Sequence, residues 1–489
     1  MSMLMRVLRI PLLTAAVVVL PAAVAAQEPL RLTLADAIAR AQAQGPTALA
    51  AKATRDAARH RDWAFTASWL PQAALNGNVP TFNRSIIPVL QPDGSTLYRA
   101  QEQNEGSLNV AITQRLPFTG GDLFLNSGLS RLDVVGNTST RTWSSTPMLV
   151  GIRQDIFRPN RARWDAREQS LRADVAERAY AEALEDVAIQ IANAFFDAYT
   201  ARLGYENAVS NAAVNDTLYT LNQGRFEVGR IGENDLLQSE LALLRSQVAL
   251  DGARLERDRT LASLRLALAL PVGAELEIIV PTEVPVVNAD TTAAVSMALR
   301  HRAQMVELEL QETQADRRIS EARYGTGIGG TISASMGLNQ TAGALDGAYR
   351  DLREAQRFTL GISMPLVNWG SRSANIQAAR LDSDRVDHLG RQTREQTSQE
   401  AHFAALGLAQ ARRQLAIAAK ADTVGAKRFE VAKNRYVIGR IGIDNLYVAQ
   451  SEKDGALNQY LNSLRGYWVA YYRLRRVTMF DFVAGAPIR

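Results

Sequence analysis

A duplicated segment constrains the fold of this chain more than any other feature of its sequence. Residues 225–237 read RFEVGRIGENDLL, and residues 435–447, which lie 210 positions further on, read RYVIGRIGIDNLY. Arginine, glycine, isoleucine and leucine recur in register between the two segments. An internal repeat of this kind predicts that both halves of the chain adopt the same structure. Each half reads as a helix, strands, a very long helix, a glycine turn and a further helix.

This order of elements divides the chain into two structural repeats joined by a proline-containing linker. The first repeat is predicted at 27–280, with strands at about 72–157, a long helix at about 160–227, a tip turn at 228–233 and a helix at about 234–270. The linker is predicted at 281–290, and the second repeat at 291–489, with strands at about 331–367, a long helix at about 371–437, a tip turn at 438–443 and a helix at about 444–479. Continuous helices at 34–69 and 292–323 are expected to lead into the strands.

The first 26 residues have the features of a secretory signal peptide. Arg6 and Arg9 precede an apolar run at 10–20, and small residues at 24–26 form a cleavage site. No other run approaches the ~18 apolar residues of a membrane-spanning helix, so an exported chain would enter a membrane only through strands. The absence of cysteine excludes disulfides, thiol nucleophiles and cysteine-bound metals. A net charge of +5 without a basic block gives no indication of nucleic-acid binding.

The long helices predict a rod. A helix over 160–227 would be roughly 100 Å long at ~1.5 Å per residue. The two shorter helices of the same repeat would match this length if they stacked end to end. Apolar residues at heptad spacing favour close antiparallel packing of these helices. These stripes are Leu241, Val248, Leu255, Ala262 and Ala269 in the first repeat and Leu457, Leu461, Leu464, Trp468 and Tyr471 in the second.

The predicted strands alternate between apolar and small or polar residues, most clearly at 331–338 and 358–367. This alternation is typical both of a membrane barrel and of a soluble antiparallel sheet. Four to six strands are too few to close a membrane barrel from one chain, since the smallest such barrels have about eight. A barrel would therefore be shared between several chains.

Four features together resemble the TolC family of outer-membrane efflux and secretion proteins. They are LTLADA at 32–37, the RF/RY-x-x-G turn in both copies, ISMPLVNWG at 362–370 with its echo IRQDIF at 152–157, and the twofold repeat. The resemblance implies an α+β fold, in which a trimeric outer-membrane β-barrel continues into a long periplasmic α-helical barrel. It also implies a passive exit duct, with no enzymatic activity and no cofactor or metal.

The same resemblance implies the partners and location of the duct. They are two further copies of the chain, a periplasmic adaptor protein, an inner-membrane pump and outer-membrane lipid. The protein would lie in the outer membrane and extend into the periplasm. The alternative that the residues leave open is a periplasmic coiled-coil structural protein with a soluble sheet.

The resemblance also assigns the glycine turns to the periplasmic tip, where they would contact the adaptor and open. The expected contact residues are Arg225, Gly229, Arg230, Gly232, Arg435, Gly439, Arg440 and Gly442. All four glycines are expected to take the positive φ of a reversing chain. A purely structural turn is the alternative.

Gate residues transfer from the family only in part. Asp235 and Tyr436 match positions that hydrogen-bond across the two repeats and hold the tip closed. The family's acidic ring maps to Asn445 and Val448, neither of which is acidic, and Asp444, next to Asn445, is the candidate substitute.

Two further observations remain from the sequence. The glycine-rich segment at 325–330 matches a dinucleotide-binding pattern, but it follows a helix and precedes a strand, which is the wrong order for such a site.

The first-repeat strand region is longer than the second by about the length of a hairpin. Four strands per chain, or twelve per trimer, are expected, and six per chain is the alternative.

Overall fold

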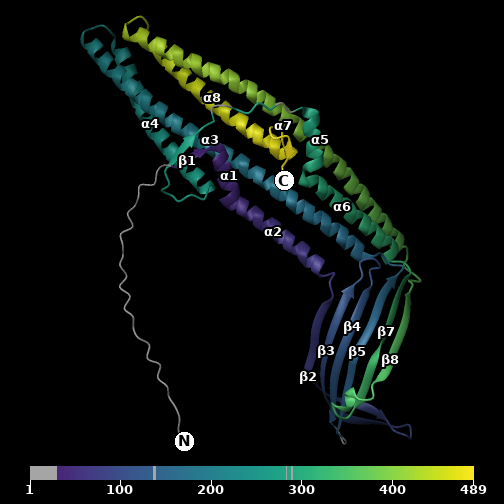
Figure 1. Ribbon diagram of the computed structural model, residues 1–489. Coiled ribbons are helices and arrows are strands. Elements are labelled where there is room, and N and C mark those ends of the chain that lie inside the picture. The colour runs from purple at the N-terminus through teal and green to yellow at the C-terminus, as the bar shows by residue number, and fades with distance from the viewer. Residues whose placement is uncertain (1–29, 136–138, 282–283, 288–289, 489) are drawn as a thin grey trace, which may run out of the picture.

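The computed structural model describes residues 30–488 apart from 136–138, 282–283 and 288–289. The signal peptide predicted at 1–26 lies outside the described residues. Figure 1 shows a rod of long helices that continues at one end into a curved sheet. The helical hairpins reverse at the opposite end of the rod. No described helix is both long enough and apolar enough to cross a membrane.

The elements of the two repeats follow each other in matching order. The first repeat contains β1 (Leu30–Thr33), α1 (Leu34–Gln44), α2 (Pro46–Ala67), β2 (Gln72–Leu90), β3 (Thr96–Arg115), β4 (Asp122–Val135), β5 (Thr140–Ile156), α3 (Arg161–Glu227), α4 (Glu233–Ala267) and β6 (Leu276–Ile279). The second contains α5 (Thr291–His301), α6 (Ala303–Ser320), the π-helical turn η1 (Glu321–Gly325), β7 (Gly329–Ala342), the 3₁₀ turn η2 (Gly347–Tyr349), β8 (Arg353–Ser363), α7 (Ser371–Val437), α8 (Ile443–Thr478), β9 (Phe480–Asp481) and β10 (Ala486–Pro487).

The repeat is exact in length along its long helices. Both α3 and α7 contain 67 residues. Each end of α7 lies 210 positions after the corresponding end of α3, and α8 begins 210 positions after α4. A residue on α3 or α4 therefore has a direct counterpart 210 positions later, on α7 or α8.

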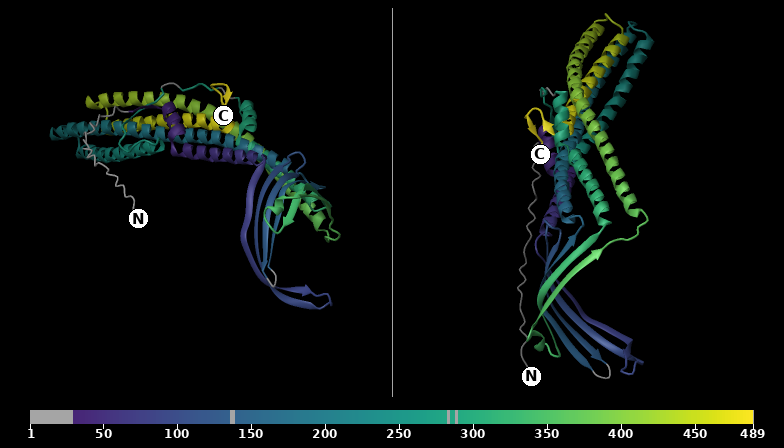
Figure 2. Two further views of the ribbon diagram at one scale, coloured as in Figure 1. Left: turned by 60° about the horizontal axis from the view of Figure 1, so that its bottom comes forward. Right: turned by 90° about the vertical axis from the view of Figure 1, so that its right-hand side faces the viewer.

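The sheet contains six described strands in the order β2-β3-β4-β5-β7-β8, and all neighbouring pairs are antiparallel. The expectation of four strands per chain is therefore wrong. The additional hairpin, β2–β3, extends the sheet because β3 pairs with β4 from Glu102–Val135 to Arg115–Asp122. Figure 2 shows that the sheet is curved and open, with β2 and β8 at its free edges.

The helices that lead into the strands are each interrupted, which the sequence analysis did not predict. The first breaks at Gly45, with φ −67° and ψ 144°, and the second at Arg302, with φ −67° and ψ 141°. Both residues are extended and end one helix while starting the next. Pro46 contributes to the first break because proline has no N–H and suits the first turn of a helix. The two repeats therefore share even this irregularity.

The helices form one curved layer. In its tip half the order across the layer is α4, α3, α8 and α7, and α3 packs against both α4 and α8. In the half nearer the sheet, α2 and α6 pack against α3, and α6 also packs against α7. The long helix α3 thus lies between half-length helices on both sides, α4 and α2 on one side and α8 and α6 on the other.

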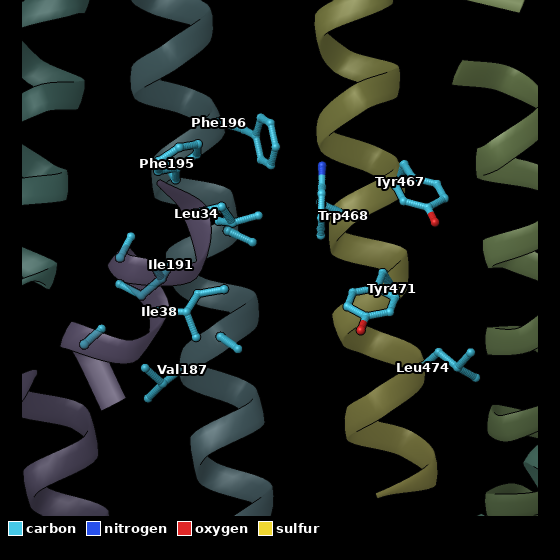
Figure 3. Close-up of a cluster of buried hydrophobic side chains, with 14 of the residues drawn as sticks. Leu34, Ile38, Val187, Ile191, Phe195, Phe196, Tyr467, Trp468, Tyr471 and Leu474 are labelled. Carbon is cyan, nitrogen blue, oxygen red and sulfur yellow. The ribbon is translucent and has the colours of Figure 1, made fainter. Parts of the chain in front are cut away.

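The largest buried cluster lies in the middle of the rod (Figure 3). It joins α1, α3 and α8 through side chains that are almost inaccessible to solvent, among them Leu34, Ile38, Val187, Ile191, Phe195, Phe196, Tyr467, Trp468, Tyr471 and Leu474. The heptad stripe of the second repeat contributes here, as the sequence indicated, since Leu461, Leu464, Trp468 and Tyr471 are buried.

The heptad stripe of the first repeat has a different position. Leu241, Val248 and Leu255 are exposed, and α4 packs on α3 through another face that includes Ser246 and Leu264. The expectation that this stripe packs within the chain is therefore wrong. Heptad spacing shows that a partner is needed, but it does not show which partner.

Candidate functional site at the helical tip

The two long helices end in the same hydrogen-bonded turn. Gly229 has φ 69° and Gly439 has φ 73°. The Arg230 N–H donates to the Arg225 carbonyl at 2.8 Å, and the Arg440 N–H donates to the Arg435 carbonyl at 2.9 Å. This is the Schellman arrangement, in which a left-handed residue lets the chain bond back to the last turn.

The other two glycines have a different conformation from the one expected. Gly232 has φ −81° and ψ 163°, and Gly442 has φ −73° and ψ 163°, so both are extended N-cap residues. The expectation of positive φ is wrong for this pair. A Cβ atom at either position would meet nothing within 4 Å in the chain. Their lack of a side chain leaves the N-termini of α4 and α8 open to solvent.

Substitution should separate the two kinds of glycine. Gly439→Ala is expected to destabilise the tip by roughly 1–2 kcal/mol, because alanine must adopt the left-handed conformation. Gly442→Ser should change stability by only a few tenths of a kcal/mol, because serine is a good N-cap. Thermal unfolding of the detergent-extracted protein, followed by circular dichroism, measures both. An equal loss in the two variants would contradict this division.

The tip arginines also differ among themselves. Arg225 is half-buried, lies over the Tyr436 ring at 5.2 Å and donates to the Val437 carbonyl at 2.8 Å. It therefore connects the two hairpins. The other three, Arg230, Arg435 and Arg440, are exposed, and within the described residues none of the four forms an ion pair.

Tyr436 bridges the two repeats as the resemblance implied, but its partner was not foreseen. Its side chain is 4% exposed, and its hydroxyl donates to Asn222 Oδ1 at 2.6 Å. Asn222 is fully buried. Asp235, in the first turn of α4, makes no side-chain hydrogen bond with the described residues. The hydrogen bond that Tyr436 makes across the repeats therefore goes to Asn222.

The two remaining gate candidates are exposed at the start of α8. Asp444 accepts a hydrogen bond from Gln238 Nε2 at 2.5 Å, which connects α8 to α4. Asn445 is exposed. The carboxylate of Asp444 is thus held by an amide from the other hairpin.

Below the tip, the seam between α3 and α8 is polar. Asp454 accepts hydrogen bonds from Asn207 Nδ2 and Asn211 Nδ2, both at 2.8 Å, and Lys453 Nζ donates to Asn211 Oδ1 at 3.2 Å. A groove of about 630 Å³ runs along these residues. Asn207, Asn211 and Asn215 recur every four residues along α3, and this spacing could have indicated a polar seam. The same spacing is also typical of a helix face in contact with water.

One tyrosine beside this seam has no hydrogen-bond partner. The Tyr447 hydroxyl is buried and unpaired within the described part of the chain, and burial raises its pKa, with Tyr436 adding to the effect. Further along the same seam, Arg465 lies 2.6 Å from Asp197 and also donates to Asn193. Hydrogen bonds to charged groups contribute about 1.5–3 kcal/mol each to stability, because water replaces the protein partner when the bond is broken. A seam so built can separate at modest cost.

Comparison with known proteins supports this fold. No protein-family model matches the sequence, and no curated protein matches it. Among solved structures, the CmeC outer membrane channel of Campylobacter jejuni matches with 16% identity and a TM-score of 0.66, over 93% of this chain and 86% of that chain. VceC, an outer membrane protein of Vibrio cholerae, matches with 15% identity and a TM-score of 0.66, over 93% and 97%.

A third solved structure is the open state of the MtrE outer membrane channel of Neisseria gonorrhoeae. It matches with 15% identity and a TM-score of 0.63, over 91% of this chain and 88% of that chain. This chain therefore has the α+β fold of the TolC-like outer-membrane efflux channels, and the resemblance stated from the sequence is confirmed at the level of the fold.

Proposed function

We propose that this chain is the outer-membrane exit duct of a tripartite efflux or secretion system. Three copies form one passive channel, which opens at the helical tip when a periplasmic adaptor and an inner-membrane pump dock. The exposed glycine turns, with Arg230, Arg435 and Arg440 around them, are the adaptor-contacting surface. The energy for export comes from the pump, so the duct needs no catalytic residue.

The observation that carries this proposal is the pair of apolar edges on the helical layer. Leu244 and Leu255 on α4 are 53% and 71% exposed, and Phe403 and Ile417 on α7 are 65% and 70% exposed. These helices lie at opposite edges of the four-helix tip half. Two different edges that are both apolar favour head-to-tail contact between copies, which closes a ring.

The repeat predicts how these edges meet. Within one chain, Asn207 on α3 bonds to Asp454 on α8. The counterpart of Asn207, 210 positions later, is Ile417 on α7, and the counterpart of Asp454, 210 positions earlier, is Leu244 on α4. The equivalent pair would therefore join Ile417 of one copy to Leu244 of the next. The observed α3–α8 seam is thus a template for an α7–α4 seam between copies.

A second contact gives the same register. Arg465 on α8 bonds to Asn193 on α3, and the counterparts of these residues are Leu255 and Phe403. In both cases a polar pair within the chain corresponds to an exposed apolar pair on the free edges. At these two positions the register places apolar side chains against each other between copies, where the seam inside the chain has polar pairs.

Cysteine cross-linking tests this arrangement directly, because the chain contains no cysteine of its own. A Leu244→Cys/Ile417→Cys variant, oxidised in outer-membrane vesicles, is expected to give a covalent ladder that ends at three chains. The matched control is Leu255→Cys/Ile417→Cys, whose α4 position is displaced by 11 residues, or roughly 16 Å, beyond the reach of a disulfide. A ladder from the control but not from the test pair would contradict the register, and no ladder from either would contradict the ring.

A further inference from the structure

A hollow of about 870 Å³ lies where the helices meet the sheet. Its walls come from the β5–α3 connection with the first turns of α3, from the segment between α6 and β7, and from the first turn of α7. Five arginines line it, Arg158, Arg163, Arg167, Arg323 and Arg372.

The charge of this hollow is strongly one-sided. The whole chain has 55 basic and 50 acidic residues, yet no carboxylate lines the hollow. Within the described residues none of its five arginines forms an ion pair. Arg158 donates to the Gly325 carbonyl at 3.1 Å, and Arg372 donates to the Arg323 carbonyl at 2.9 Å. These contacts orient the guanidinium groups without neutralising their charge.

The glycine-rich segment at 325–330 has its structural role here. A Cβ atom at Gly329 would come within 2.8 Å of Arg158 Nε and Nη2, and one at Gly327 would come within 3.2 Å of Arg372 Nη2. Glycine at these positions lets both guanidinium groups lie directly against the backbone. The segment that matched a dinucleotide pattern therefore makes room for two arginines of the hollow.

We propose that this hollow binds the phosphate headgroup of an anionic membrane phospholipid. Guanidinium groups match phosphate oxygens in geometry and charge. Phe157, Trp164 and Tyr324 also line the hollow and offer apolar surface to the glycerol and acyl part of a lipid, which free phosphate lacks.

The location supports a lipid as the source of the phosphate. The residues that line the hollow lie between β5 and α3, between α6 and β7 and at the start of α7. Figure 1 shows these segments at the end of the strands, where a membrane-embedded sheet would give way to helices in water. Basic pockets at this level of membrane proteins bind anionic headgroups, and tryptophan and tyrosine gather there. This step rests on the proposed function, because that function places the sheet in the outer membrane.

Native mass spectrometry of the full chain in detergent tests the inference. Phosphatidylglycerol is expected to be retained about tenfold more than phosphatidylcholine, which has no net charge. An Arg163→Gln/Arg372→Gln variant should lose this preference about tenfold. The matched control is Arg254→Gln/Arg412→Gln, which removes two exposed helical arginines outside the hollow that form no ion pair in the described chain.

Three outcomes overturn the inference. One is equal retention of the two lipids by the unaltered chain, and another is an equal loss in the test and control variants. The third is complete displacement of phosphatidylglycerol by millimolar inorganic phosphate, which would identify a free-anion site. The oligomer mass from the same spectra separates this result from the proposed function. A trimer that binds no lipid overturns the lipid site alone, and a monomer overturns the duct.

Discussion

Replacing Leu244 by aspartate is expected to dissociate the trimer into single chains. Leu244 is proposed to lie against Ile417 of the next copy, where Ile417 and Ala421 replace the two asparagines that bond to Asp454 inside the chain. A carboxylate enclosed there loses its water without gaining a partner, which costs several kcal/mol per ion. The ring contains this seam three times. Light scattering of the detergent-extracted protein, corrected for bound detergent, should fall from the mass of three chains to that of one.

The repeat itself supplies a rescue for this variant. Asp454, the counterpart of Leu244, is stabilised within the chain by Asn207 and Asn211. Adding Ile417→Asn and Ala421→Asn to Leu244→Asp would place the same two amides opposite the new carboxylate. This triple variant is expected to recover the trimer. Ala249→Asp, which adds the same charge at an exposed position on another face of α4, is the control and should leave the mass unchanged.

The outcome distinguishes a wrong register from a wrong assembly. A trimer that survives Leu244→Asp would show that α4 does not face its neighbour at this position. A single variant that dissociates and a triple variant that does not recover would place Leu244 in the seam without supporting its pairing with Ile417. Only dissociation of the Leu244→Asp variant followed by recovery in the triple variant supports both the assembly and the pairing of Leu244 with Ile417.

The sequence predicted the fold of this chain because the fold depends on repeated, local patterns. Two 67-residue helices without proline and two copies of one glycine turn are visible in a single sequence. They require a long hairpin in each half. The alternation at 331–338 likewise requires only neighbouring strands, and it forms part of β7.

The sequence could not show which partner covers each apolar stripe. The stripes at Leu241 and at Leu461 have the same heptad spacing, but the first is exposed and the second is buried in the rod. The difference depends on the position of α4 at the edge of a layer, with α8 inside it. Position within a layer is a tertiary property, and for an edge helix the covering partner belongs to another copy.

The same limit applies to the tip and to the hollow. Asn222 was not singled out, because one asparagine on a long helix has no local signature, and its role depends on Tyr436, 214 positions away. The glycines at 325–330 match a dinucleotide-binding pattern, but in the structure they make room for arginine side chains. Their actual neighbour, Arg158, is distant in the sequence and meets them only through the β5–β7 pairing.

Loosening the polar seam inside the chain is expected to open the duct while leaving the trimer intact. A Tyr436→Phe/Asp454→Ala variant removes the bond to Asn222 and the two bonds from Asn207 and Asn211. At about 0.5–1.5 kcal/mol for the Tyr436 bond and about 1.5–3 kcal/mol for each bond to the carboxylate, the closed state loses roughly 3.5–7.5 kcal/mol per chain. Since a factor of ten corresponds to ~1.4 kcal/mol, the open probability in planar bilayers should rise at least tenfold.

The opposite change should hold the duct closed. An Asn207→Ile/Asn211→Ala/Asp454→Leu variant gives the seam within the chain the same residues as the proposed seam between copies. Apolar contact has no comparable replacement by water, so this seam should separate less readily than the polar one. Fewer spontaneous openings than in the unaltered channel are expected at an unchanged trimer mass. If both variants changed the conductance in the same direction, the α3–α8 seam would not control the tip. Opposite changes would identify it as the joint at which the duct opens, with the apolar seams between copies holding the ring together as it does so.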